Sequence, residues 1–211
     1  MSGIPAYAVQ FRGFWACPCQ VEWIPAYEHE LQRRGLLAPG QQLHLYQLIG
    51  FYSGSGNTHS TGGATDFVDL IGTEELWVAR QMGADATWTR PPNWDGKGGI
   101  AHNHSVLTGC PHNEACRYQI DEVRAGGDGL LGNAPDPGPR PLSGRTWQQG
   151  IEWARQQEED MPLNDADKAW IEKTVKTAVE AAFTKDQKNG RNLRANVVAI
   201  ARKVGVKPAE D

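Results

Sequence analysis

Two side chains that can bind a metal ion lie on either side of a glycine pair. His59 and Asp66 are seven residues apart in the segment NTHSTGGATDFVDL, and Gly62 and Gly63 lie between them. Because glycine adopts positive φ angles at little cost, the chain can fold at this corner until the imidazole and the carboxylate face one point. Zinc accepts both kinds of donor atom, at about 2.0 to 2.2 Å. The segment therefore predicts two ligands of one metal site.

A third ligand is expected from a histidine pair further along the chain. His102 and His104 lie in the segment GGIAHNHSVL. In a β-strand, side chains two residues apart point to the same face of the sheet. One of the two imidazoles can then bind the metal ion while the other faces the substrate.

The order of these residues resembles the family of zinc D-Ala-D-Ala carboxypeptidases and L,D-endopeptidases, which includes phage lysins and has the hedgehog/DD-peptidase fold. The resemblance covers roughly residues 43–106 and consists of the H-x6-D spacing, with Gly62 and Ala64 inside it, followed by the H-x-H pair. It implies an α+β fold in which a small antiparallel sheet is flanked by helices and followed by a helical C-terminal region.

Carried over residue by residue, the resemblance implies that His59, Asp66 and His104 hold Zn²⁺. His102 would then lie beside the ion and stabilise the transition state of metal-assisted amide hydrolysis. The expected substrates are peptide bonds that contain D-amino acids in the stem peptides of bacterial peptidoglycan. The expected context is a phage enzyme, either in the virion tail or released from the host cytoplasm at lysis.

One position departs from the family pattern. The family has an aspartate or glutamate just before the last ligand, where it serves as general base, and Ala101 occupies that place here. The candidates to replace it are Asp95, Glu114, Asp121 and Glu122, of which Asp95 is our choice. The alternative is a catalytically impaired member of the fold that serves as a structural tail protein or a wall-binding protein.

Residues ahead of the histidine pair are candidates for substrate binding. Arg90 can meet the carboxylate of a stem peptide, because a guanidinium group matches carboxylate geometry. Trp94, together with Trp88, can line a groove for the substrate. The alternatives are a surface arginine and tryptophans that pack in a small core.

The charge and hydropathy of the sequence argue against nucleic acid as a partner and against a membrane span. The 211 residues carry a formal net charge of −4 and have a pI near 5.9, which gives no basic field for nucleic acid. No apolar run approaches the about 20 residues that span a bilayer. The N-terminus lacks a basic segment followed by a long apolar one, so we expect no secretory signal peptide.

The four cysteines are compatible with several chemical roles. Cys17 and Cys19 form a C-x-C pair, and Cys110 and Cys116 a C-x5-C pair. Neither spacing matches the C-x2-C pairs of zinc ribbons, which favours a disulfide or free thiols over a four-cysteine metal site. A further alternative is a separate structural metal site drawn from the segment that contains His102, His104, Cys110, His112 and Cys116.

Periodicity and Gly/Pro punctuation predict the elements that position these residues. We expect helices near 26–34, 73–83, 113–127, 144–158, 161–185 and 189–204, and strands near 43–51, 64–72 and across the histidine pair. The segment ATWTRPPNWDGKGG is expected to be extended around its Pro-Pro pair.

The same signals predict the domain organisation. Residues 1–133 would form the peptidase-like domain, residues 134–143 a Pro/Gly-rich linker, and residues 144–211 a helical region. We expect that region to dock on the main domain, pair with a second copy, or attach to other phage tail proteins.

Overall fold

The computed structural model describes residues 3–51, 57–68, 72–93, 99–129, 134–159 and 172–177. The chain divides into two units, residues 1–159 and residues 160–211. In the second unit, residues 172–177 are helical, and the rest of the expected C-terminal helices lies outside the described residues.

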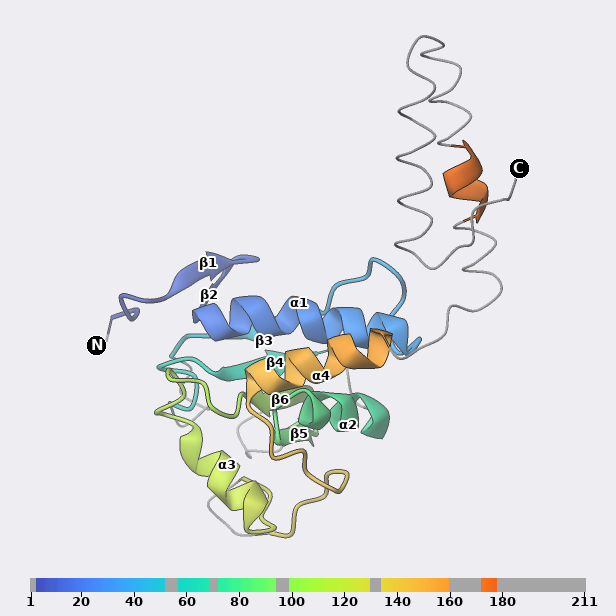
Figure 1. The fold of residues 1–211 in the computed structure, drawn as a ribbon. Coiled ribbons are helices and arrows are strands. Elements are labelled where there is room, and N and C mark those ends of the chain that lie inside the picture. The colour runs from blue at the N-terminus through green and yellow to red at the C-terminus, as the bar shows by residue number, and fades with distance from the viewer. Residues whose placement is uncertain are drawn as a thin grey trace. The chain divides into compact units, whose positions relative to one another are not determined.

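The first unit contains six strands and four helices in its described part (Figure 1). The strands are β1 (Val9–Phe11), β2 (Phe14–Ala16), β3 (Leu45–Gln47), β4 (Ala64–Phe67), β5 (Ala86–Arg90) and β6 (His102–Val106). The helices are α1 (Pro18–Arg33), α2 (Thr73–Gln81), α3 (Arg117–Arg124) and α4 (Trp147–Glu159). The expected α+β class is confirmed.

A four-stranded antiparallel sheet organises the unit. Its strand order is β3-β4-β6-β5, and β1 and β2 form a separate hairpin. His104 in β6 is paired with Asp66 in β4 on one side and with Trp88 in β5 on the other. Because paired residues point to the same face of a sheet, the two expected metal ligands and Trp88 share one face.

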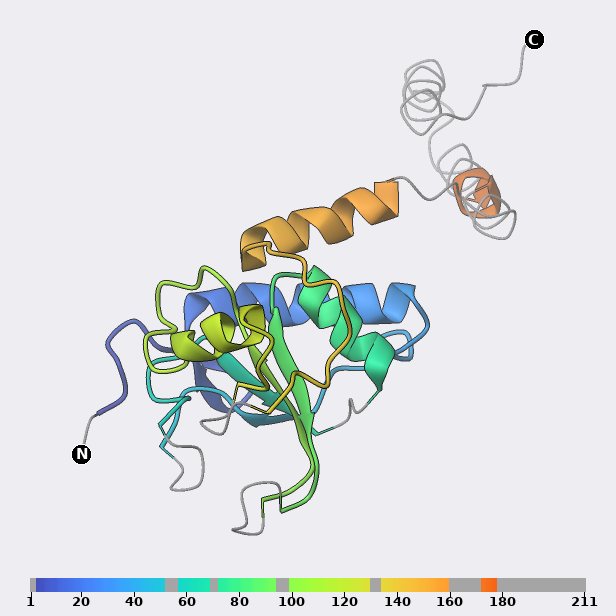
Figure 2. The same ribbon diagram turned by 90° about the horizontal axis from the view of Figure 1, so that it is seen from below.

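Helix α1 lies over the opposite face of the sheet, α2 packs against α1 and β5, and α4 packs on α1 (Figures 1 and 2). Trp23 and Tyr27 of α1 stack with ring centroids 4.7 Å apart, and both rings contact Phe67 of β4. The indole N–H of Trp23 donates to the carbonyl of Met82 at 2.8 Å, which ties α1 to the end of α2. This is the larger hydrophobic core.

Helix α1 begins eight residues earlier than the apolar pattern predicts. Pro18 occupies its first turn, where the missing N–H would have no helical partner in any case, and the backbone N–H of Cys17 donates to the side chain of Gln20 at 2.9 Å. Pro25 lies inside the helix and breaks the sequence signal there. The predicted helix near 26–34 is therefore the C-terminal half of α1.

The face that carries the histidines is covered by α3, which lies below the sheet in Figure 1. Ile120 and Val123 of α3 pack with Trp88 and Val106 in a smaller core. Trp88 is fully buried, so the expectation that it lines a substrate groove is wrong and the packing alternative holds. Trp94 lies outside the described residues.

The Pro/Gly-rich segment 134–143 packs on the first unit, whereas its composition predicts a linker with a boundary near Asn133. Its Asp136 forms a bidentate ion pair with Arg80, with oxygen-to-nitrogen distances of 2.8 and 2.9 Å. The indole N–H of Trp88 donates to the same carboxylate at 3.0 Å. The compact unit accordingly continues through α4 to Glu159.

No helix among the described residues has the length and apolar character to cross a bilayer.

The tight packing of the glycine pair between His59 and Asp66 can be tested by substitution. Gly63 has φ +77°, and a Cβ added there would lie 2.6 Å from Cβ of Asn113, whereas Gly40 has φ +76° and open space around it. Gly40→Ala should cost about 1 to 2 kcal/mol for the left-handed backbone alone. Gly63→Ala should cost about 1 to 3 kcal/mol more, because of the steric overlap. Urea denaturation of both variants measures the difference, and equal losses would contradict this packing.

Candidate metal centre

Three side chains from separate segments converge on one point. Nε2 of His59 lies 3.2 Å from Oδ2 of Asp66, and Nδ1 of His104 lies 2.8 Å from Oδ1 of the same carboxylate. One ligand atom from each residue lies within 4.8 Å of the others, and all three side chains are buried. The structure thus brings together the three residues that the sequence predicts as ligands.

The fold explains this convergence. Asp66 and His104 lie opposite each other on paired strands, so their side chains must meet on one face. His59 reaches the same face because Gly62 and Gly63 turn the chain back with φ angles of +96° and +77°. The carbonyl of His59 accepts a hydrogen bond from the backbone N–H of Gly50 at 3.1 Å, which fixes the loop against the end of β3.

The second nitrogen of each ligand imidazole is engaged by a hydrogen-bond acceptor. Nδ1 of His59 lies 3.0 Å from the carbonyl oxygen of Leu48, which can only accept. Nε2 of His104 lies 2.9 Å from Oε1 of Gln119, whose own amide N–H donates to the carbonyl of Gly129 at 3.1 Å. Each ring therefore carries a hydrogen on its outer nitrogen, and in the neutral form of the ring the inner nitrogen presents its lone pair to Asp66.

This arrangement of side chains is stable only with a cation bound among them. Two imidazole lone pairs and a carboxylate face one another at hydrogen-bonding distance, so a proton or a metal ion must lie among them to offset their repulsion. Metal-binding histidines characteristically donate their other N–H to an outer acceptor, as both do here. The donor set of two nitrogens and one oxygen fits zinc with a fourth position left for water or substrate.

The ionisation of the site favours metal binding at neutral pH. Burial raises the pKa of Asp66, but positive charge and hydrogen bonds from His59 and His104, in the forms that carry a proton on the inner nitrogens, outweigh burial and hold this pKa well below its ordinary value. Burial lowers the pKa of His104, against an opposing effect of Asp66. The carboxylate is therefore ionised and His104 is neutral, which are the forms that bind metal.

His102 lies beside the three converging side chains. Its Nδ1–H donates to the carbonyl of Ile100 at 2.8 Å, which leaves the lone pair on Nε2. Nε2 lies 3.9 Å from Oδ2 of Asp66. The ring also contacts Tyr46, with centroids 5.8 Å apart. His102 thus faces the site without joining the closest group.

Arg90 places a buried positive charge near the site. It pairs with His102 across the β5–β6 ladder, and only 5% of its surface is exposed, which excludes a surface arginine. Its guanidinium lies over the ring of Trp88, 4.9 Å from the centroid, and donates to the carbonyl of Asp128 at 3.0 Å. Burial lowers the pKa of Arg90, while the carboxylates of Asp128 and Asp66 oppose this effect.

No second carboxylate joins the His59–Asp66–His104 group in the described part of the chain. Asp95, the candidate general base, lies outside the described residues. Glu114 and Asp121 are exposed to solvent, and the carboxylate of Glu122 turns toward Gly127.

Gln119 contacts the candidate metal centre, and the sequence does not reveal it. It lies on the buried side of α3, and its amide sets the ring orientation of His104. Neutral glutamine on a short amphipathic helix carries no ligand signature. One sequence signal could have indicated that Gln119 is buried. It lies three residues after Cys116, the N-cap of α3, and residues with this spacing lie on the same face of a helix.

The cysteine-containing segment divides between two groups. His104 belongs to the group with His59 and Asp66, whereas Cys110 and His112 lie with Cys17 and Cys19. Cys116 belongs to neither group. All four cysteines are free thiols, so the disulfide alternative is not realised.

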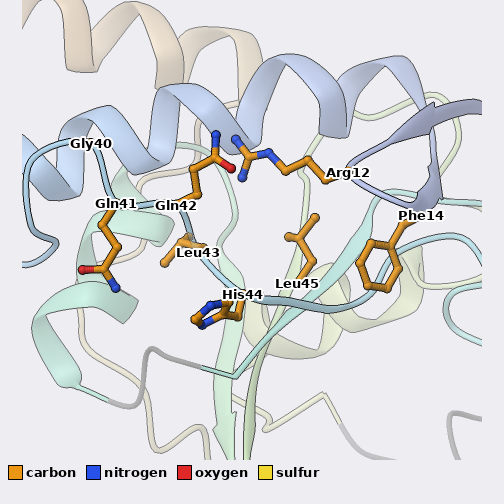
Figure 3. Close-up of a pocket in the computed structure, with 8 residues that line it drawn as sticks. All are labelled: Arg12, Phe14, Gly40, Gln41, Gln42, Leu43, His44 and Leu45. Atoms are coloured by element: carbon orange, nitrogen blue, oxygen red, sulfur yellow. The ribbon is translucent and has the colours of Figure 1, made fainter.

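A surface hollow of about 570 Å³ lies elsewhere, beside the β1–β2 hairpin (Figure 3). It is lined by Arg12, Phe14 and residues 40–45. None of the residues that converge on Asp66 lines this hollow, and it brings no pair of catalytic side chains together. The metal centre is therefore the stronger functional candidate.

Comparison with known proteins gave no match to a family model, to a curated protein or to a solved structure.

The contact between Gln119 and His104 predicts a loss of metal affinity. Gln119→Leu removes the acceptor for the Nε2–H of His104 and should weaken zinc binding by about 10- to 100-fold. Gln119→Glu keeps an acceptor and should retain most of the affinity. Competition with a chromophoric chelator measures both, and an unchanged Gln119→Leu variant would contradict the assigned ring orientation.

Proposed function

We propose that this chain is a zinc-dependent peptidase with a hedgehog/DD-peptidase-like fold that cleaves D-amino-acid-containing peptide bonds of bacterial peptidoglycan. One observation carries the proposal. The lone pairs of His59 Nε2 and His104 Nδ1 converge on the Asp66 carboxylate while Leu48 and Gln119 occupy the outer ring nitrogens. This is the pattern of a three-ligand zinc site with one open position.

Zinc bound there would supply Lewis acidity, which polarises a scissile carbonyl and activates water. The chain's own residues would orient the substrate and hold charge around it. His102 keeps Nε2 toward the site, and in its protonated form this atom can donate to an oxyanion. Arg90 adds a buried cation one strand away, which favours a substrate that carries a carboxylate, such as a stem peptide.

A second candidate is a virion or wall-binding protein that keeps the metal centre without turnover. Ala101 favours it, because this position lacks the carboxylate that the resemblance requires. A general base must come within hydrogen-bond reach of the water that it activates. In this proposal Asp95 supplies that base for the peptidase, and its absence from the site would leave the structural role.

The proposed setting is a phage particle or phage-driven lysis. The protein would act as a tail-associated or lytic enzyme on cell-wall peptides, and the residues after 160 would attach it to other tail proteins or to a second copy. These assignments rest on the resemblance of residues 43–106 to phage wall-cleaving enzymes.

The test uses the full chain loaded with zinc and incubated with purified bacterial cell walls. Mass spectrometry of the released material should detect stem-peptide fragments with new termini at D-amino-acid bonds. No release by protein with measured zinc bound would reject the peptidase. Wall adhesion without hydrolysis, lost on chelation of the metal, would instead support the second candidate.

A further inference from the structure

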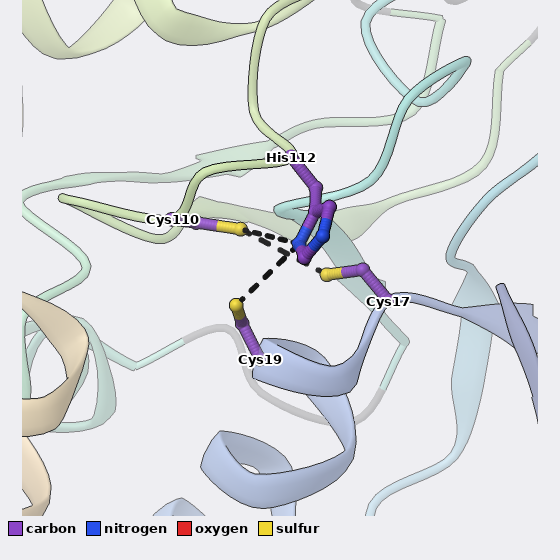
Figure 4. A group of neighbouring side chains, drawn as sticks. All are labelled: Cys17, Cys19, Cys110 and His112. Carbon is purple, nitrogen blue, oxygen red and sulfur yellow. Dashed lines mark hydrogen bonds between the residues drawn. The ribbon is translucent and has the colours of Figure 1, made fainter. Parts of the chain in front are cut away.

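We propose that Cys17, Cys19, Cys110 and His112 bind a second zinc ion, with a structural role. Cys17 caps α1 and Cys19 lies in its first turn, while Cys110 and His112 belong to the turn after β6 (Figure 4). The three cysteines are buried, and one ligand atom from each of the four residues lies within 4.8 Å of the others. These residues are separate from the His59–Asp66–His104 group, so the inference does not depend on the proposed function.

The spacing of the donor atoms matches a tetrahedral zinc site. With Zn–S bonds of about 2.3 Å and Zn–N bonds of about 2.0 to 2.1 Å, a regular tetrahedron has S···S edges of about 3.8 Å and S···N edges of about 3.6 Å. The sulfurs of Cys17 and Cys110 lie 3.8 Å apart. Nδ1 of His112 lies 3.7 Å from the sulfur of Cys19 and 3.9 Å from that of Cys110.

The same distances argue against the other uses of these cysteines. A disulfide requires sulfurs about 2.05 Å apart, which is far shorter than the 3.8 Å between Cys17 and Cys110. Thiolates with one imidazole select zinc among the common divalent ions of cells, whereas magnesium and calcium require oxygen ligands. Four protein ligands also close the coordination shell, which is the mark of a structural rather than a catalytic zinc.

The position of the site gives it a role in the fold. It joins two segments 93 residues apart in the chain. A Cβ added at Gly62 would lie 3.0 Å from Cβ of Cys17, and one added at Gly63 would lie 3.4 Å from Sγ of Cys110. The glycine corner that separates His59 from Asp66 therefore rests against the cysteines. Zinc held by them would brace that corner and the end of β6 together.

The test is metal analysis of the full chain, together with the visible and near-ultraviolet spectrum of its cobalt(II)-substituted form. Wild-type protein should hold two zinc ions per chain and show a thiolate-to-cobalt charge-transfer band. Cys19→Ser should lose one ion and the band, whereas His104→Ala should lose one ion and keep the band. Cys116→Ser is the matched control, because Cys116 is equally buried but lies outside the group, and it should keep both ions and the band.

Two results would overturn the proposal. One is a cobalt-loaded wild-type protein without the charge-transfer band, a measurement that does not require any variant to fold. The other is a Cys17–Cys110 disulfide in protein purified under reducing conditions. Thermal melting adds a readout of the structural role. Chelation should lower the melting temperature of His104→Ala by several degrees, and it should leave that of the double variant Cys19→Ser/His104→Ala nearly unchanged, because neither metal site remains in it.

Discussion

His104→Ala is expected to abolish the proposed peptidoglycan hydrolysis and to prevent zinc binding at the candidate centre formed with His59 and Asp66. The substitution deletes an inner nitrogen that lies 2.8 Å from the Asp66 carboxylate. Two remaining ligands hold zinc poorly, so the loss of affinity should exceed the about 10- to 100-fold expected for a residue that only orients a ligand. Fragment release from cell walls and zinc content measure the two effects.

His29→Ala is the matched control for this substitution. His29 is exposed on α1 and belongs to neither metal-binding group. It should retain full zinc content and full activity. If His104→Ala cleaved cell walls at the wild-type rate, the assignment of His104 as a ligand of a catalytic metal would be wrong.

Asp136→Asn is expected to cause a large loss of stability in the first unit. The guanidinium of Arg80 is fully buried, and the side chain of Asp136 is 1% exposed. Removing one partner of a buried ion pair costs about 3 to 5 kcal/mol, because the other charge remains buried without compensation. Chemical denaturation of the metal-loaded protein measures the change, and a loss below about 1 kcal/mol would be typical of a surface pair instead.

The same pair predicts a pH dependence. Burial raises the pKa of Asp136, but hydrogen bonds from Arg80 and Gly138 outweigh burial, and the net pKa is lowered. A carboxyl group with a lowered pKa in the folded state stabilises the fold above its unfolded pKa of about 3.9 and loses that contribution as the pH falls through the folded value. The stability difference between wild type and Asp136→Asn should therefore be constant from pH 7 to 5 and shrink below pH 4. A difference that grows on acidification would contradict the assigned pair.

Short-range spacing made the metal ligands predictable. His59 and Asp66 are close in sequence with two glycines between them, and His102 and His104 alternate as a strand requires. Once β4 and β6 pair, the register that sets Asp66 opposite His104 brings the distant ligand to the others. The α+β class followed from the same residues through the family that they resemble.

Contacts made across the fold were not predictable in this way. The cysteine group joins C-x-C to C-x-H over 93 residues, and neither half has the C-x2-C spacing of a zinc ribbon. The sequence analysis placed Cys110 and His112 in a possible metal site with residues close to them in the chain, because no sequence pattern indicates that Cys17 lies near the end of β6. Only the packing of α1 on the sheet does so.

Composition misplaced the end of the first unit for a related reason. The segment 134–143 contains prolines and glycines and no apolar periodicity, which are the signs of a linker. Polar contacts hold it in place: Asp136 binds Arg80 and accepts the indole hydrogen of Trp88, and Ser143 donates to Asp85. A search for apolar periodicity cannot detect such polar contacts, because it considers only the apolar residues of the segment itself.

The most direct test of the metal centre is anomalous diffraction at the zinc absorption edge from crystals of the wild-type chain grown with zinc. We expect a peak bonded to Nε2 of His59, an oxygen of Asp66 and Nδ1 of His104, at about 2.0 to 2.2 Å, with one position left for water. Absence of a peak there, or a zinc that His104 binds through Nε2, would contradict the account.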